Sequence, residues 1–210
     1  MKRLADEIDV VLFDVGGVLA EMKGVPTMLA WLDNRLSPDE LWAVWLTSPA
    51  VRKFETGRIE PNEFAEEIIL ELSLPVNQEA FLSSFRGWLA GLYPGALELV
   101  GSVPARFRRA TLCNTSVLHW PRLMSDFHLE HMFHHHFASH LTGRIKPDRE
   151  AFHLVLDTLG CKPSAVFFMD DNSLNVEAAQ QIGMRAVQVK GPDEARHALT
   201  EAKILSGSCG

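Results

Sequence analysis

The chain has 210 residues, of which 47% are hydrophobic and 22% charged, and its 27 acidic and 20 basic side chains leave a net charge of −7. This length predicts one domain, or one domain with an insertion, that buries a core without disulfides or structural metals. The acidic balance argues against a nucleic-acid-binding protein, which normally carries a basic face. No apolar run reaches the roughly 18 residues of a membrane-spanning helix.

The N-terminus and the cysteines bear on where the protein works. Residues 1–9 are charged and lead directly into an apolar run, so we expect no signal peptide. The three cysteines, Cys113, Cys161 and Cys209, are an odd number without metal-site spacing. A reduced, cytoplasmic protein is therefore expected.

The first predicted element is a strand over residues 8–13, with the sequence IDVVLF. Its near-continuous apolarity is typical of a strand buried on both faces, as in a parallel sheet. Asp14 follows directly, and Gly16 and Gly17 then allow an open, flexible turn.

A helical segment, residues 21–93, comes next, and we call it the cap. Ser37 to Glu40 predicts a capping box with proline at the first helical position, and Ser48-Pro49 begins a short helix that ends at Gly57. Residues 60–72 and 77–89 complete the helices, and no convincing strand interrupts them. This helical segment is too long to be a simple crossover connection between two strands of a sheet. The prediction is therefore a small helical cap inserted into an α/β core of residues 1–20 and 94–210.

Three further strands are predicted after the cap, over residues 110–113, 165–169 and 186–189. The helices between them show the usual proline start and glycine stop: residues 147–159 begin at Pro147 and precede Gly160, and residues 173–182 precede Gly183. This alternation predicts an α/β fold built on a doubly wound parallel sheet.

Carboxylates and an amide follow these strands, at the sheet edge where ligands bind in such folds, and a lysine precedes the helix that leads to the strand over residues 165–169. They are Asp14, Asn114, Lys146 and the adjacent pair Asp170 and Asp171. An aspartate can attack phosphorus, a hard cation prefers oxygen ligands, and a lysine balances the charge of a phosphoryl group. The alternative, in which these aspartates only cap helices, is weak for the adjacent pair, because two buried carboxylates repel without a cation or a proton.

Four motifs in order resemble the haloacid dehalogenase (HAD) superfamily: FDVGGVL (13–19), TLCNTS (111–116), GRIKPD (143–148) and VFFMDDNSLNVEAAQQIGM (166–184). The resemblance spans almost the whole chain and is greatest to small capped phosphatases, namely the α-D-glucose-1-phosphate phosphatase group and the phosphatase domain of epoxide hydrolases. It implies a Rossmann-like core with a helical cap. It also implies Mg²⁺-dependent hydrolysis of a small phosphate ester, with a sugar phosphate as one candidate, through an aspartyl-phosphate intermediate.

The resemblance also implies roles for individual residues. Asp14 would be the nucleophile, and Lys146 would hold the nucleophile and the phosphoryl oxygens. The metal ligands would be Asp14, the backbone carbonyl of Gly16, and Asp171 with Asp170 beside it. The phosphate would lie on Cys113, Asn114 and Thr115. Asn175 would lie just outside the metal ligands.

Two positions depart from the family pattern. Many family phosphatases have an aspartate, the general acid and base, where this chain has Gly16. Ser or Thr is usual where this chain has Cys113, and a thiol is a weaker hydrogen-bond donor than a hydroxyl. A chain without the acid should favour substrates whose leaving oxygen is already acidic. His119 and Glu21 are candidate replacements, although a helix surface is expected for His119 and a solvated position for Glu21.

Other interpretations of the sequence are open. In a 2-haloacid dehalogenase Asp14 would attack carbon, but those relatives lack the paired acids of residues 170 and 171 and need no metal. Gly16 and Cys113 favour a non-catalytic binding protein on the same scaffold. The histidines between His128 and His140 could bind zinc, but they are expected to lie away from the cleft. The expected partner is a small phosphorylated metabolite, with no nucleic acid and no membrane, and either a monomer or a homodimer is compatible with the sequence.

Overall fold

The computed structural model describes residues 7–206, so Cys209 and the outermost ends of the predicted core lie outside the described residues. Its central sheet has five parallel strands in the order β5-β4-β1-β6-β7. They are β1 (Val10–Phe13), β4 (Arg108–Cys113), β5 (His135–Ala138), β6 (Val166–Asp170) and β7 (Arg185–Gln188). The chain runs from β1 outward to β5 and returns to β6 on the other side of β1. The predicted doubly wound α/β fold is confirmed.

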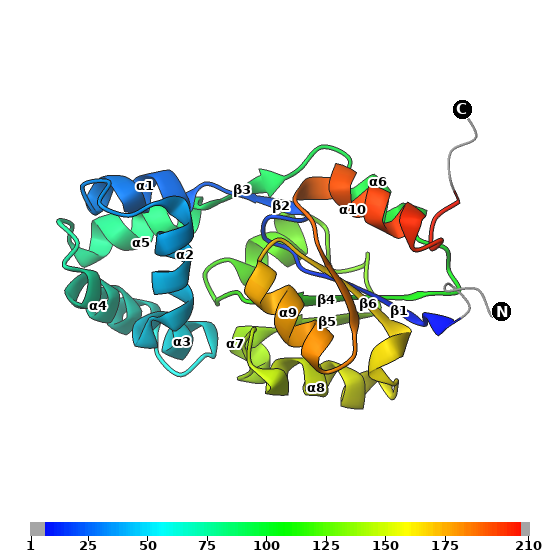
Figure 1. The fold of residues 1–210 in the computed structure, drawn as a ribbon. Coiled ribbons are helices and arrows are strands. Elements are labelled where there is room, and N and C mark those ends of the chain that lie inside the picture. Colours follow the sequence, from blue (N-terminus) through cyan, green and yellow to red (C-terminus); the bar gives the residue numbers. More distant parts are fainter. Residues whose placement is uncertain (1–6, 207–210) are drawn as a thin grey trace.

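Helices cover both faces of this sheet (Figure 1). The helices α6 (Ala96–Ser102) and α10 (Gly191–Glu201) lie on one face, and α8 (Arg149–Leu159) and α9 (Ser173–Gln181) lie on the other. Successive side chains of β1 alternate between the two cores: Val11 packs with the first pair of helices and Leu12 with the second. Burial on both faces explains why the central strand β1, with the sequence VVLF, is apolar throughout.

The cap consists of helices packed around an apolar cluster of their own. They are α1 (Gly24–Trp31), α2 (Pro38–Thr47), α3 (Pro49–Glu55), α4 (Pro61–Leu72) and α5 (Gln78–Gly87). The predicted capping box is present, because Ser37 N donates to Glu40 Oε2 at 2.8 Å and Glu40 N donates to Ser37 Oγ at 3.3 Å. Aromatic rings fill the centre of the cluster, where Phe54 and Phe64 stack with ring centroids 4.2 Å apart.

The expectation of no strand in residues 21–93 is wrong at both ends of the cap. The strands β2 (Ala20–Met22) and β3 (Leu89–Leu92) pair antiparallel and join the cap to the core, and the helix expected to reach residue 89 ends at Gly87. Each strand is too short to show an alternating pattern, and each forms only because the other lies beside it. The division into a core of residues 1–20 and 94–210 and a cap remains a prediction.

Short helical elements complete the described chain. They are the π-helical turn η2 (Arg122–Asp126), α7 (Ser139–Thr142) and the 3₁₀ turn η3 (Pro163–Ala165). The helix expected to begin at Pro147 begins two residues later, at Arg149. None of the helices in residues 7–206 combines the length and apolarity needed to cross a membrane.

Candidate active site

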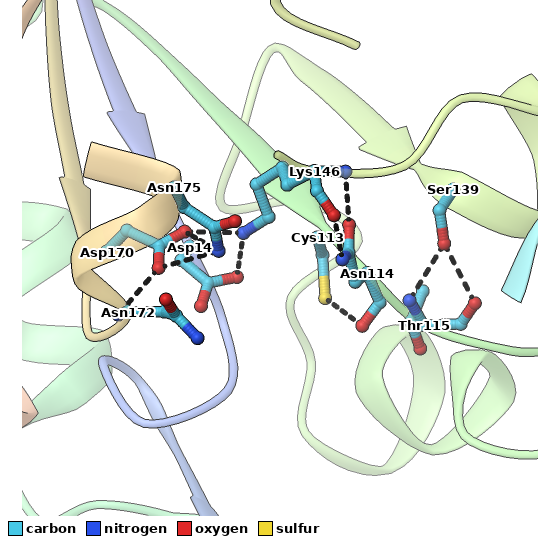
Figure 2. Close-up of polar contacts among 9 residues, drawn as sticks. All are labelled: Asp14, Cys113, Asn114, Thr115, Ser139, Lys146, Asp170, Asn172 and Asn175. Atoms are coloured by element: carbon cyan, nitrogen blue, oxygen red, sulfur yellow. Dashed lines mark hydrogen bonds and ion pairs between the residues drawn. The ribbon is translucent and has the colours of Figure 1, made fainter. Parts of the chain in front are cut away.

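Lys146 lies at the centre of a buried ion-pair network (Figure 2). Its Nζ lies 2.8 Å from Asp14 Oδ1 and 2.6 Å from Asp170 Oδ2. Asp14 follows β1, Asp170 ends β6, and Lys146 lies in the loop before α8, so the switch point of the sheet brings them together. Burial alone would lower the pKa of Lys146, but the two carboxylates more than offset this and raise it above its usual range. Lys146 is therefore a fixed cation.

Asp14, the residue expected to be the nucleophile, is a buried carboxyl beside Lys146. Burial raises the pKa of its carboxyl to about 8, with Lys146 acting in the opposite direction and Asp170 and Asp171 raising it further. Without a cation beyond Lys146, the site therefore holds more negative charge than it can neutralise.

Asp170 is held on every side. It accepts hydrogen bonds from Lys146 Nζ, from Asn175 Nδ2 at 3.0 and 3.1 Å, and from the backbone N–H of Asn172 at 2.9 Å. Its side chain is 0% exposed. These contacts make Asp170 the anchor that orients Lys146 and Asn175.

Asp171 lies against the turn that follows Asp14. A Cβ atom on Gly17 would lie 2.2 Å from Asp171 Oδ2, and Gly17 has a φ of +71°. Only glycine therefore lets this turn approach the carboxylate so closely. Burial raises the pKa of Asp171 to about 6, Asp170 raises it further, and Lys146 lowers it.

The arrangement fits a divalent cation. Carboxylate oxygens of Asp14, Asp170 and Asp171 lie within 4.8 Å of one another. Oxygen ligands with excess negative charge suit a hard ion such as Mg²⁺. Asn175 Oδ1 is buried without a hydrogen-bond partner, so it could accept from a water on such an ion. Gly16 lines the cavity beside Asp14.

The corner after β4 is tied to the lysine loop. Asn114 Nδ2 donates to the carbonyl oxygen of Lys146 at 2.9 Å, and Lys146 N donates to Asn114 Oδ1 at 2.9 Å (Figure 2). Ser139 Oγ accepts from Thr115 N at 2.9 Å and donates to Thr115 O at 3.0 Å. The Asn114 amide therefore positions Lys146, and phosphate binding by Asn114 and Thr115 stays a prediction. Sequence reasoning misses Ser139 because nothing in its local sequence marks the approach of α7 to this corner.

Cys113 offers little nucleophilic reactivity. Its thiol is buried, and Sγ lies 3.5 Å from the carbonyl oxygen of Asn114. Burial raises the pKa of this thiol well above its usual range, with Asp14 adding to the effect. The thiol form therefore prevails over the reactive thiolate.

A cavity of about 600 Å³ lies above these residues, with a polar floor and a largely apolar roof. Asp14, Asn114 and Lys146 contribute to the floor. The roof comes from the cap and includes Met28, Leu41, Trp42, Trp45, Phe85 and Trp88. Trp42, Trp45 and Trp88 therefore contact the apolar cluster of the cap and also line the cavity.

The two candidate replacement acids have different surroundings. The surface position expected for His119 is wrong: the residue is 6% exposed, lines the cavity, and places Nε2 2.7 Å from the carbonyl oxygen of Phe85. Its ring also stacks on Phe85, and burial lowers its pKa. Glu21 pairs with Lys23 at 3.0 Å and its side chain is 42% exposed, as expected for a solvated residue. A carboxylate that the sequence did not indicate, Glu55 of α3, lines the cavity instead.

Two of the clustered histidines, His134 and His136, form hydrogen bonds at the edge of the sheet. His134 Nδ1 accepts from Arg109 N at 3.0 Å, and His136 Nδ1 lies 3.0 Å from Thr111 Oγ1. Both contacts connect β4 to the β5 segment.

Comparisons with known proteins agree on one family. The family model of haloacid dehalogenase-like hydrolases matches residues 8–183. A sesquiterpene phosphatase from Aspergillus oryzae is 29% identical over 82% of this chain and 85% of its own length. A flavin mononucleotide hydrolase from Arabidopsis thaliana is 25% identical over 94% of this chain and 79% of its own. A HAD family enzyme from Bacteroides thetaiotaomicron, solved with magnesium and inorganic phosphate, superposes with a TM-score of 0.68 at 23% identity, covering 87% of this chain and 94% of its own.

Proposed function

The chain belongs to the haloacid dehalogenase-like hydrolases, whose family model spans residues 8–183, and on that basis we propose that it is a Mg²⁺-dependent phosphatase acting through an aspartyl-phosphate intermediate. The observation that carries this proposal is the buried network in which Lys146 bridges Asp14 and Asp170. A nucleophilic carboxylate, a fixed cation and a three-carboxylate site meet at the floor of one cavity.

In this mechanism Asp14 attacks phosphorus while the bond from phosphorus to the leaving oxygen breaks. Lys146 keeps the carboxylate oriented and balances the charge on the phosphoryl oxygens. Water then attacks the phosphorus of the aspartyl-phosphate, which restores Asp14 and releases inorganic phosphate. Cys113, Asn114 and Thr115 form the corner on which the phosphoryl group lies.

The residues proposed to hold Mg²⁺ are Asp14, Asp171 and the carbonyl of Gly16, with Asp170 and Asn175 supporting them from outside. When bound, the ion neutralises negative charge on the carboxylates and on the phosphoryl oxygens. Asn175 would orient an ion-bound water through its unpartnered Oδ1. The names of the relatives, a sesquiterpene phosphatase and a flavin mononucleotide hydrolase, are consistent with phosphate ester chemistry.

The roof of the cavity favours a phosphate ester whose organic part is apolar or aromatic. Met28, Leu41 and Trp42 offer dispersion contacts and no charge to such a group. A sugar phosphate, the other candidate, would need several hydrogen bonds that these side chains do not provide. We therefore expect higher kcat/KM for prenyl or aryl monophosphates than for hexose phosphates, measured as phosphate release in a matched panel.

Asp14→Asn tests the proposed function. The amide keeps the shape of the side chain but cannot attack phosphorus, so we expect at least a ~10³-fold loss of Mg²⁺-dependent phosphate release from p-nitrophenyl phosphate. A circular dichroism spectrum like that of the wild type would show that the fold is intact. Turnover near the wild-type level, with contaminating phosphatases excluded, would remove Asp14 as the nucleophile.

The dehalogenase and binding-protein alternatives give different results. Halide release from a 2-haloacid that persists in EDTA would favour the dehalogenase. Phosphate binding without turnover of any ester would favour the binding protein. We also propose a cytoplasmic location, which suits the free thiols of Cys113 and Cys161.

A further inference from the structure

Glu55 is a carboxylate of the cap on the wall of the cavity that holds the candidate catalytic residues. It is the last residue of α3, it is half-buried, and it lines the cavity that contains Asp14 and Lys146. The other cavity-lining carboxylates in residues 7–206 are Asp14, Asp171 and the exposed Asp39 of α2. Since Asp14 and Asp171 belong to the ion-binding floor, Glu55 is the shielded carboxyl available on the cap side.

Contacts with the core on both sides of Glu55 fix its position. Three residues before it, Arg52 forms an ion pair with Asp148, which lies at the start of α8. Two residues after it, Gly57 has a φ of +70°, and a Cβ there would lie 2.4 Å from the carbonyl oxygen of His140. Figure 1 shows α3 beside α7 at the junction of cap and core. The cap therefore presents Glu55 between two residues, Arg52 and Gly57, that both contact the core.

The surroundings of Glu55 allow it to exchange a proton. Burial raises the pKa of its carboxyl to about 7, while Trp45, Lys146 and Arg52 act in the opposite direction. The charge of Glu55 also contributes to the raised pKa of the Cys113 thiol. A general acid and base works best when its pKa lies near the working pH.

We propose that Glu55 is the general acid and base of this enzyme, supplied by the cap in place of the aspartate that is absent at Gly16. The inference rests on the proposed phosphatase function. As Asp14 attacks phosphorus and the P–O bond to the leaving group breaks, the Glu55 carboxyl gives its proton to the leaving oxygen, which departs as an alcohol. The Glu55 carboxylate then takes a proton from the water that attacks the aspartyl-phosphate. The P–O bond to Asp14 breaks, inorganic phosphate leaves, and the acid is regenerated.

The other candidates are less suited to this step. The Nε2 atom of His119 is already within hydrogen-bond distance of the Phe85 carbonyl, and its ring packs against the Phe85 ring. Glu21 is paired with Lys23 in solvent. Gly16 has no side chain, so it can neither protonate a leaving alkoxide nor take a proton from the attacking water.

The test compares two esters whose leaving groups differ in acidity. Glu55→Gln keeps the size of the side chain but cannot donate or accept the catalytic proton, and the exposed cap residue Glu66→Gln is the matched control. With n-octyl phosphate, whose alkoxide must be protonated, we expect Glu55→Gln to lower kcat/KM by ~10²–10⁴-fold. With p-nitrophenyl phosphate the loss should be at least about tenfold smaller, because its leaving oxygen departs without a proton. Glu66→Gln should leave the ratio of the two values unchanged.

Two outcomes separate this inference from the function on which it rests. An equal loss on both esters in Glu55→Gln would overturn the proton-transfer role, because a structural role affects both alike. Absence of turnover of either ester by the wild-type protein with Mg²⁺ would overturn the phosphatase itself. The pH profile gives a further readout. Turnover of octyl phosphate should fall as the pH rises through about 7, when Glu55 loses its proton, and Glu55→Gln should lack this fall.

Rescue at the family's usual position completes the experiment. A Cβ on Gly16 would meet only Met22, at 3.5 and 3.8 Å, so an aspartate can begin there without a backbone clash. Gly16→Asp in the Glu55→Gln background should restore part of the octyl phosphate turnover. The double variant could instead retain p-nitrophenyl phosphate turnover and gain nothing on octyl phosphate. That result would contradict the proposal that Glu55 does the work of an aspartate at position 16.

Discussion

The two adjacent glycines that follow Asp14 closely, Gly16 and Gly17, have different steric surroundings. A side chain at Gly16 would meet ordinary van der Waals contacts, whereas one at Gly17 would collide with the carboxylate of Asp171. The left-handed backbone at Gly17, with a φ of +71°, adds strain for any other residue. Gly17 is therefore required for the close approach of the turn to Asp171, whereas Gly16, in the proposed mechanism, leaves the catalytic proton to another group.

Gly17→Ala should weaken Mg²⁺ binding, because the new methyl group must displace Asp171. We expect the Mg²⁺ concentration at half-maximal activity to rise by roughly 10–100-fold, the usual effect of disturbing a metal ligand's support. Gly16→Ala is the control at the neighbouring position. Its methyl group would meet no close contact, so we expect a smaller rise in the Mg²⁺ concentration at half-maximal activity. Equal Mg²⁺ midpoints in Gly17→Ala and the wild type would show that Asp171 does not bind the ion.

The helix α3 connects the cap to the chemistry of the core. It carries Phe54 into the aromatic centre of the cap and directs Arg52 toward Asp148 of the core. The turn that follows it packs against His140 through a glycine. The helix α3 thus packs in the apolar cluster of the cap and also contacts the α/β core. A change in how it docks on the core should therefore alter the position of Glu55 and the shape of the cavity.

Gly57→Ala should loosen this docking. The methyl group would lie 2.4 Å from the His140 carbonyl oxygen in a left-handed turn, and we expect a loss of about 1–3 kcal/mol in the free energy of unfolding, together with a higher KM. Gly160→Ala, at the left-handed C-cap of α8 with no atom within 4 Å of the added Cβ, is the control for backbone strain alone. Gly57→Ala and Gly160→Ala could instead lose equal stability and leave KM unchanged. That result would show that the contact between the turn after α3 and His140 does not affect substrate binding.

Three buried or partly buried carboxylates, those of Asp14, Asp170 and Asp171, concentrate negative charge at one end of the sheet. Burial raises the pKa values of Asp14 and Asp171, so the folded chain holds these carboxylates at a free-energy cost. A cation that binds only the folded state removes part of this cost. The site should therefore couple ion binding to the stability of the protein.

Added Mg²⁺ should raise the melting temperature measured by differential scanning fluorimetry. At about 100 times its Kd an ion adds ~2.7 kcal/mol, which corresponds to about 5–10 °C for a chain of this size. Asp171→Asn should reduce this shift more than Asp170→Asn, because Asp170 is already engaged by Lys146, Asn175 and the Asn172 N–H. EDTA should abolish turnover, and excess Mg²⁺ should restore it. An unchanged melting temperature at millimolar Mg²⁺ would argue against the ion site.

Local patterns in the sequence predict four of the five strands of the sheet, and they miss β5, whose first two residues are histidines. Buried parallel strands are apolar along their whole length, and their carboxyl ends fall at one sheet edge, so the sequence alone predicts that Asp14, Asn114 and Asp170 lie together. The capping box that begins at Ser37 is equally local.

Contacts between distant segments depend on the folded chain instead. They include the pairing of β2 with β3, the burial of His119 under Phe85, and the docking of α3 that brings Glu55 to the cavity. The physical reason is that each of these contacts depends on which surface another segment presents. The residues next to a side chain in the sequence therefore do not predict which distant segment it will contact.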